Sequence, residues 1–78
     1  MITGTQIRGA RALLGWSASA LARAARVRPT TVQRAEATDG EPAITMVQVN
    51  AIQRVLEAAG VEFTNGEPGV QMRKQETR

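Results

Sequence analysis

The residues of this sequence with the clearest capacity for chemistry are the arginines between Ser17 and Glu36. This stretch reads SASALARAARVRPTTVQRAE, and its charged and hydrogen-bonding side chains alternate with small apolar residues. The guanidinium group of arginine forms paired hydrogen bonds with phosphate and with guanine, whereas threonine and glutamine can bind phosphate oxygens or base edges. This combination favours recognition of a polyanion, nucleic acid above all, over catalysis.

The charge of the chain is divided unevenly along its length. Residues 1–35 contain six arginines and no acidic residue, so they carry a charge of +6, whereas residues 36–78 contain four basic residues and all seven acids. Such asymmetry points to a negatively charged partner that faces the first half. A solvated charged surface would give the same count; the clustering of the arginines in one stretch is what favours nucleic acid.

Catalysis, metal binding and cofactor binding have little support in the sequence. The 78 residues suffice for one small domain, and they include neither histidine nor cysteine, which removes common general bases, nucleophiles and zinc ligands. Ser17 and Ser19 have no adjacent base, the carboxylates lack calcium-loop spacing, and there is no glycine-rich phosphate loop. We therefore expect a protein that is not an enzyme and has no metal or cofactor. Without a membrane-length apolar run or a signal peptide, it is also expected to be cytoplasmic.

Two short helices joined by a tight turn are expected to position the arginines. Ser17 is a suitable N-cap for a helix that ends at Ala25, and Pro29 suits the first turn of a second helix that ends at Ala37. Apolar residues at helical spacing predict a shared core for the two helices. Its expected members are Leu21, Ala24, Val27 and Val32.

Two longer helices are expected to support this pair. A helix over residues 5–14 would begin at the capping residue Thr5 and end at a left-handed Gly15, with Trp16 partly buried beyond it. A helix over residues 45–59 would follow the pair. Their buried residues, predicted from helical spacing, are Ile7, Ala10, Leu13, Leu14, Val49, Ile52, Val55, Leu56 and Ala59.

The sequence changes from helical to strand periodicity after Gly60. Residues 61–64 and 70–73 alternate apolar and polar side chains, and Asn65-Gly66 is a strong turn signal between them. This pattern predicts a short C-terminal β-hairpin.

Three parts of the chain are therefore expected: a helical domain over residues 1–60, the hairpin over 61–73 and a disordered tail over 74–78. An isolated hairpin is marginal in water, so this one is expected to pack on the helices or to pair across a dimer. Phe63 and Met72 are the exposed candidates for a dimer contact.

The pattern of residues in the central stretch is similar to that of a known family. The matching positions are Ser17, Leu21, Ala22, Val27, Thr31, Val32 and Glu36. Over roughly residues 5–59 the sequence resembles the phage-repressor and Cro-like helix-turn-helix family of bacterial transcriptional regulators. The resemblance implies an all-α, four-helix DNA-binding domain, here with a C-terminal β-hairpin, in which residues 29–37 form the recognition helix. It also implies a structural salt bridge between Arg11 and Glu36.

Three positions depart from the family pattern. Ala18 stands where the family has a glutamine, so that position offers DNA only backbone N–H groups at a helix start. Arg26 stands at the turn glycine, where a left-handed conformation would cost on the order of 1 kcal/mol. Ala35 replaces a bulky residue, so Trp16 or the fourth helix is expected to fill the space.

The predicted DNA contacts lie on the outer face of the central pair. Those expected at base edges are Arg28, Thr30, Gln33 and Arg34. Those expected at phosphates are Ser17, Ala18, Arg23, Arg26 and Thr31. Alternatives stay open: Arg34, Gln33 and Arg28 suit phosphates as well, both threonines suit purely structural roles, and any of the arginines suits a solvated surface.

The function expected from these residues and from the resemblance is sequence-specific binding of double-stranded DNA. A homodimer would bind an inverted-repeat operator and act as a repressor, although activation stays open. The alternative is a protein-interaction module, an antiactivator or antitoxin, which uses the same fold to bind a regulator or a toxin. Salt discriminates between the two, because only binding to phosphates weakens steeply as salt rises.

Overall fold

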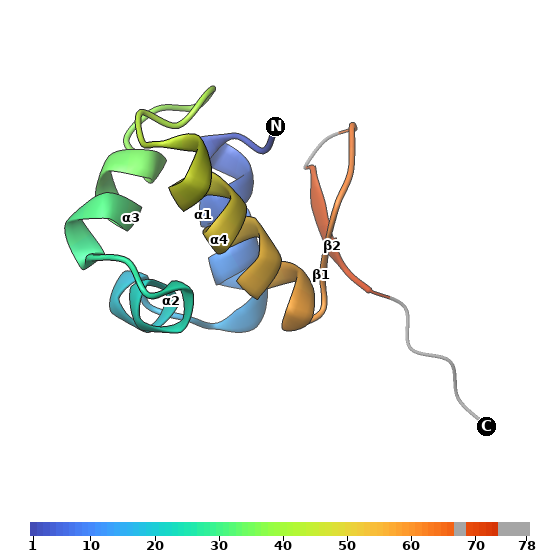
Figure 1. The fold of residues 1–78 in the computed structure, drawn as a ribbon. Helices are drawn as coiled ribbons and strands as arrows, with labels where there is room; N and C mark the ends of the chain where they lie inside the picture. The colour runs from blue at the N-terminus through green and yellow to red at the C-terminus, as the bar shows by residue number, and fades with distance from the viewer. Residues whose placement is uncertain (67–68, 74–78) are drawn as a thin grey trace.

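The computed structural model describes residues 1–66 and 69–73, which form four helices followed by an antiparallel β-hairpin (Figure 1). The elements are α1 (Gly4–Leu14), α2 (Ala18–Ala25), α3 (Pro29–Glu36), α4 (Met46–Ala58), β1 (Val61–Phe63) and β2 (Val70–Met72). The expected mostly helical chain with a C-terminal hairpin is thereby confirmed. The tail expected to be disordered, residues 74–78, lies outside the described residues.

Hydroxyl side chains fix the start of three helices. Ser17 accepts a hydrogen bond from the backbone N–H of Ala20 at the start of α2, and Thr45 forms a capping box with Gln48 at the start of α4. The prediction that Thr5 caps the first helix is wrong. Thr3 is the N-cap of α1, because the side-chain oxygen of Gln6, three residues later, accepts a hydrogen bond from the Thr3 N–H and completes a capping box.

The ends of α1 and α2 are both left-handed. Gly15 has φ 68° and Arg26 has φ 60°, and the N–H groups of these residues bind carbonyls of the helices that they close. In the described chain Arg26 is the only residue other than glycine with a positive φ. The turn between α2 and α3 thus keeps a conformation that costs an arginine on the order of 1 kcal/mol.

Residues from all six elements form one core. Its buried apolar members are Ile2, Ile7, Ala10, Leu21, Ala22, Ala25, Val32, Ala35, Val49, Ile52, Leu56, Val61 and Val70. Leu14, Trp16, Val27 and Val55 are partly buried against it, so Trp16 has its expected place.

Two of the predicted core residues are exposed instead. Leu13 is 45% exposed, because at 3.6 residues per turn it lies about 120° around α1 from the buried Ile7. Ala24 is exposed, and Ala25 is buried, since a residue four positions after Leu21 lies above it on the same face of α2.

The hairpin packs on α1 and α4 with one face. Its pairing places Val61 opposite Met72 and Phe63 opposite Val70, so these four side chains point to the same side of the sheet. Phe63 is half-buried against the core, so the expectation that it is exposed is wrong; its place opposite the buried Val70 turns it toward the helices. Met72, at the end of the sheet, is 45% exposed.

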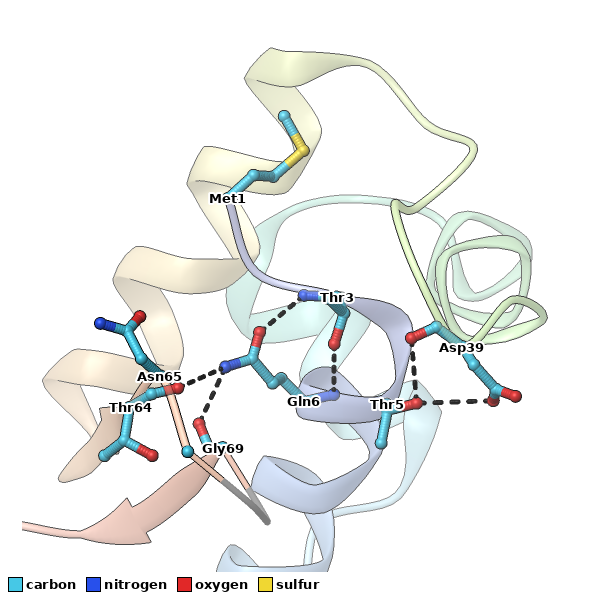
Figure 2. Close-up of a pocket in the computed structure, with 9 residues that line it drawn as sticks. Met1, Thr3, Thr5, Gln6, Asp39, Thr64, Asn65 and Gly69 are labelled. Atoms are coloured by element: carbon cyan, nitrogen blue, oxygen red, sulfur yellow. Dashed lines mark hydrogen bonds between the residues drawn. The ribbon is translucent and has the colours of Figure 1, made fainter.

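Gln6 joins the hairpin to the start of α1 (Figure 2). Its side-chain nitrogen donates to the carbonyls of Thr64, at 3.1 Å, and Gly69, at 2.9 Å, while its oxygen accepts from the Thr3 N–H at 2.8 Å. Gly69 has φ 87°, and a Cβ there would lie 3.0 Å from Gln6 Cγ. The hydrogen bonds of Gln6 cross the open pocket at this junction and hold the hairpin against α1.

Candidate functional site

The C-terminal end of α3 is attached to α1 by a partly buried ion pair. Arg11 Nε lies 2.7 Å from Glu36 Oε2, and Arg11 Nη2 lies 2.8 Å from Oε1, so the two groups meet in bidentate geometry. Glu36 is 9% exposed, and the hydrogen bond to its carboxylate raises the pKa of the Arg11 guanidinium. The third nitrogen, Nη1, donates to the Trp16 carbonyl at 3.0 Å. The pair implied by the family resemblance is therefore present, and it fixes the direction of α3.

A second arginine of α1 binds the same end of α3. Arg8 Nη1 donates to the backbone carbonyl of Glu36, and Nη2 donates to Asp39 Oδ1 at 2.7 Å and to Thr5 Oγ1 at 3.2 Å. The hydrogen bond from Arg8 holds the pKa of the Asp39 carboxyl below its ordinary value. Sequence reasoning missed this role, although Arg8 precedes Arg11 by three residues and shares its side of the helix.

The remaining arginines of residues 1–35 lie on the outer surface of α2, the turn and α3. These are Arg23, Arg26, Arg28 and Arg34, and all four are exposed. Within residues 1–66 and 69–73 the two salt bridges are Arg8–Asp39 and Arg11–Glu36, so neither of them includes an arginine of this surface. We call this surface, with Ser17, Ala18, Thr30, Thr31 and Gln33, the α2–α3 surface. It carries four positive charges and no carboxylate.

Packing between α2 and α3 sets the shape of the α2–α3 surface. Leu21 and Ala22 from α2 and Val32 and Ala35 from α3 are all buried, with Val32 and Ala35 fully so. The turn is closed by a hydrogen bond of 2.9 Å from the Val27 N–H to the Ala22 carbonyl. Small side chains at this contact let the two helices approach closely, which presents their outer faces as one surface.

The structure places the predicted base-contact residues on the outer face of α3 and at its N-cap. Arg28 is the N-cap of α3 and makes no side-chain capping bond, Thr30 is exposed in the first turn, and Gln33 and Arg34 are exposed one turn later. Figure 1 shows α3 at the edge of the helical bundle, on the opposite side of the molecule from the hairpin. Nothing in the described chain covers these side chains.

The predicted phosphate-contact residues surround that face. Arg23 and Arg26 are exposed on α2 and the turn, and Ala18 is half-buried at the start of α2. The Ser17 hydroxyl is already bound to the Ala20 N–H at 3.0 Å, so its free contribution is the donor proton of the hydroxyl. Thr31 is half-buried rather than open.

A groove that the sequence did not indicate lies beside these residues. Its walls are Arg26, Arg28 and Thr31 on one side and the first turns of α4, with Val47 and Gln48, on the other. Val47 is 78% exposed, and the neighbouring Met46 is 57% exposed. Helical spacing predicted the buried face of α4 well, and it contains no signal for which outer residues meet the turn.

Among the described residues, no three side chains of histidine, cysteine, aspartate or glutamate come together as a metal site would require. No helix in the same part of the chain is both long and apolar enough to cross a membrane. Comparison of the sequence with protein-family models finds no match, and a search of curated proteins finds no significant match.

Proposed function

We propose that this protein is a sequence-specific regulator of transcription that binds double-stranded DNA through a helix-turn-helix pair, α2 and α3. The observation that carries the proposal is that α3 is attached to the protein at one end and exposed along one face. Its C-terminal end is bound to α1 through Glu36, whereas its outer face is uncovered and carries Thr30, Gln33 and Arg34, with Arg28 at its N-cap. A helix held in this way suits insertion of its exposed face into the major groove.

The side chains of α3 have the chemistry for reading bases. Arg34 suits bidentate bonding to guanine O6 and N7, and Gln33 suits the N6 and N7 groups of adenine. Thr30, in the first turn, can place its methyl group against that of thymine. Arg28 lies at the helix start, within reach of a base or of the backbone.

The rest of the α2–α3 surface suits the phosphate backbone. The first N–H groups of α2, at Ala18 and Ser19, have no helical acceptor and favour an anion even though Ala18 offers no side chain. Arg23, Arg26 and Thr31 extend this contact on either side of the turn. Binding is expected to depend steeply on salt for this reason.

A homodimer on an inverted repeat follows from the size of the domain. One recognition helix reads only a few base pairs, and two related by a twofold axis would read half-sites about one turn of DNA, roughly 34 Å, apart. Met72 remains the exposed dimer candidate, since Phe63 is turned toward the helices. Occlusion of a promoter, hence repression, is the simplest outcome for a domain of this size.

The proposal is tested by selecting duplexes from a random pool and measuring the affinity of the purified protein for the selected and for scrambled duplexes at about 150 mM salt, where nonspecific binding is weak. Loss of a bidentate guanine contact is worth about 1–3 kcal/mol, so Arg34→Ala is expected to weaken specific binding roughly 5- to 150-fold. Arg73→Ala is the matched control. It removes the same charge from the hairpin, which packs on α1 and α4 and not on α3. Selection that yields no preferred sequence would overturn the proposal, and equal loss in the two variants would remove Arg34 as a base contact.

The groove between the turn and α4 favours a second candidate function, binding of a protein partner. Val47 exposes apolar surface in the same groove as Arg26 and Arg28, and apolar contacts flanked by arginine are typical of protein interfaces. Val47→Ser would weaken such binding and leave DNA affinity unchanged. Binding through the groove would also respond far less to salt than binding to phosphates.

A further inference from the structure

Arg8 links three groups that lie around the end of α3. Its guanidinium binds the Glu36 carbonyl, which belongs to the last residue of α3, and the carboxylate of Asp39 in the following loop, with Nη2 to Oδ1 at 2.7 Å. The third partner, Thr5 Oγ1, also donates to the Asp39 carbonyl at 3.1 Å. Arg11 binds the side chain of Glu36 and the carbonyl of Trp16, so of the two arginines only Arg8 binds the backbone at which α3 ends.

The end of α3 has few other means of satisfying its carbonyl groups. Its C-cap, Ala37, stays in the right-handed region with φ −72°, so no left-handed residue turns the chain back as at Gly15 and Arg26. The last carbonyls of a helix lack partners and carry a partial negative charge, and a cation placed there is stabilising. The guanidinium of Arg8 is therefore the C-terminal cap that the sequence of α3 lacks.

The loop after α3 wraps closely around the start of α1, which leaves little freedom at this junction. The Gly4 N–H donates to the Gly40 carbonyl at 2.8 Å. A Cβ at Gly4 would lie 2.6 Å from the Ala35 carbonyl oxygen and closer still to that of Thr38. Loss of the Arg8 contacts is therefore expected to shift α3, because the tightly packed loop cannot rearrange to compensate.

We propose that Arg8 is a positioning residue for the recognition helix: it sets the angle and depth of α3 by binding its C-terminal end, and it does not contact DNA. The inference rests on the proposed function. It also lowers the number of positive charges in residues 1–35 that are available to DNA. Two of the six arginines pair with carboxylates within the protein, and four are left to face DNA.

Salt dependence separates positioning from phosphate contact. Affinities of wild type, Arg8→Ala and Arg23→Ala are measured from about 50 to 200 mM salt on the selected and on scrambled duplexes. Arg8→Ala is expected to lower the preference for the selected duplex at least 10-fold while the slope of log affinity against log salt stays unchanged. Arg23→Ala is expected to reduce that slope by about 0.9, the value for one phosphate contact, and to weaken both duplexes alike. Arg8→Lys keeps the charge but not the fork of donors, so it should recover only part of the preference.

Stability is controlled by measuring each variant at a temperature where circular dichroism shows it fully folded. A shallower salt slope for Arg8→Ala would show that Arg8 contacts phosphate, and an unchanged preference would show that it only stabilises the fold. Either result overturns the inference.

A measurement without DNA keeps this inference separate from the proposed function. Amide hydrogen exchange along α3 is compared between wild type and Arg8→Ala, with Arg23→Ala as the control. Faster exchange throughout residues 30–35 in Arg8→Ala alone supports positioning, even if the wild type selects no duplex. Faster exchange confined to residues 37–40 overturns it.

Discussion

The arginines of α1 and those of the α2–α3 surface have the same side chain, but the former bind within the protein and the latter are exposed. Arg8 and Arg11 turn toward the protein: Arg11 binds the Glu36 carboxylate through two hydrogen bonds, and Arg8 binds the Glu36 carbonyl and Asp39 in the following loop. Arg23, Arg26, Arg28 and Arg34 turn outward and share no salt bridge within the described residues. The difference lies in the acceptors within reach: α1 passes beside Glu36 and Asp39, whereas residues 17–35, which include α2 and α3 up to Glu36, contain no acid.

This comparison teaches that net charge describes an interface only after the internal pairs are removed. The charge of +6 in residues 1–35 includes two arginines that are anchors of α3. The two groups also cooperate, because the outward arginines of α3 are positioned only as well as the inward ones hold the helix. Substitutions in the two groups should therefore differ in kind: anchors affect stability and specificity, and outward arginines affect affinity and salt dependence.

The largest effect is expected from breaking the Arg11–Glu36 ion pair, which attaches α3 to α1. Glu36→Ala leaves the Arg11 guanidinium without its carboxylate in a partly buried position, and loss of one partner of such a pair costs about 3 kcal/mol. The free energy of unfolding in urea measures this loss. Since both anchors act on the same end of α3, selectivity for duplex DNA should fall as well.

Glu41→Ala is the matched control for this prediction. Glu41 is exposed, and no salt bridge of the described residues includes its carboxylate, so its loss should change stability by no more than about 0.5 kcal/mol. Equal stability of the two variants would mean that the Arg11–Glu36 pair does not anchor α3.

A smaller effect, of opposite sign, is expected at Arg26, which is outward-facing and strained. Its φ of 60° suits glycine, so Arg26→Gly should stabilise the protein by up to about 1 kcal/mol. The same substitution removes a predicted phosphate contact and should weaken binding to selected and scrambled DNA equally. Thermal unfolding and binding, measured on one preparation, check both effects.

Gly15 provides the control, because it closes α1 in nearly the same conformation with φ 68°. A Cβ at Gly15 would meet no atom within 4 Å, so Gly15→Ala isolates the cost of the backbone conformation. It should destabilise by about 1 kcal/mol and leave DNA affinity unchanged. If Arg26→Gly also destabilised the protein, contacts of the Arg26 side chain would outweigh its strain.

Local signals in the sequence predicted the elements well. Ser17, Pro29 and Gly15 mark helix ends by their own conformational preferences, and alternation after Gly60 marked the hairpin. The errors arose where two local signals compete or where packing decides. Thr3 and Thr5 can both cap a helix, and only Thr3 has a glutamine three residues later.

The sequence indicated the candidate residues on the outer face of α3, but it could not show which arginines bind within the protein. Helical spacing places Arg28, Thr30, Gln33 and Arg34 outside the buried row of Val32 and Ala35. Spacing within α1 could not show that Arg8 meets Asp39, 31 residues away, because that contact depends on the path of the loop after α3. The groove against α4 was missed for the same reason.

The smallest effect on stability is expected at the exposed Arg8–Asp39 pair, and it depends on pH. The hydrogen bond from Arg8 lowers the pKa of Asp39 in the folded protein, so the Arg8–Asp39 pair stabilises the fold at pH values above the unfolded-state pKa, about 3.9. This stability is lost as the pH falls through the lowered pKa. The difference in free energy of unfolding between wild type and Asp39→Asn should therefore be present at pH 7 and shrink below about pH 4. Asp39→Asn keeps the backbone carbonyl that Thr5 binds, so equal stability of the two proteins at pH 7 would assign the role of Asp39 to that bond, and Arg8 would then hold α3 through the Glu36 carbonyl alone. A difference that stays constant down to acid pH would contradict the pairing of charges.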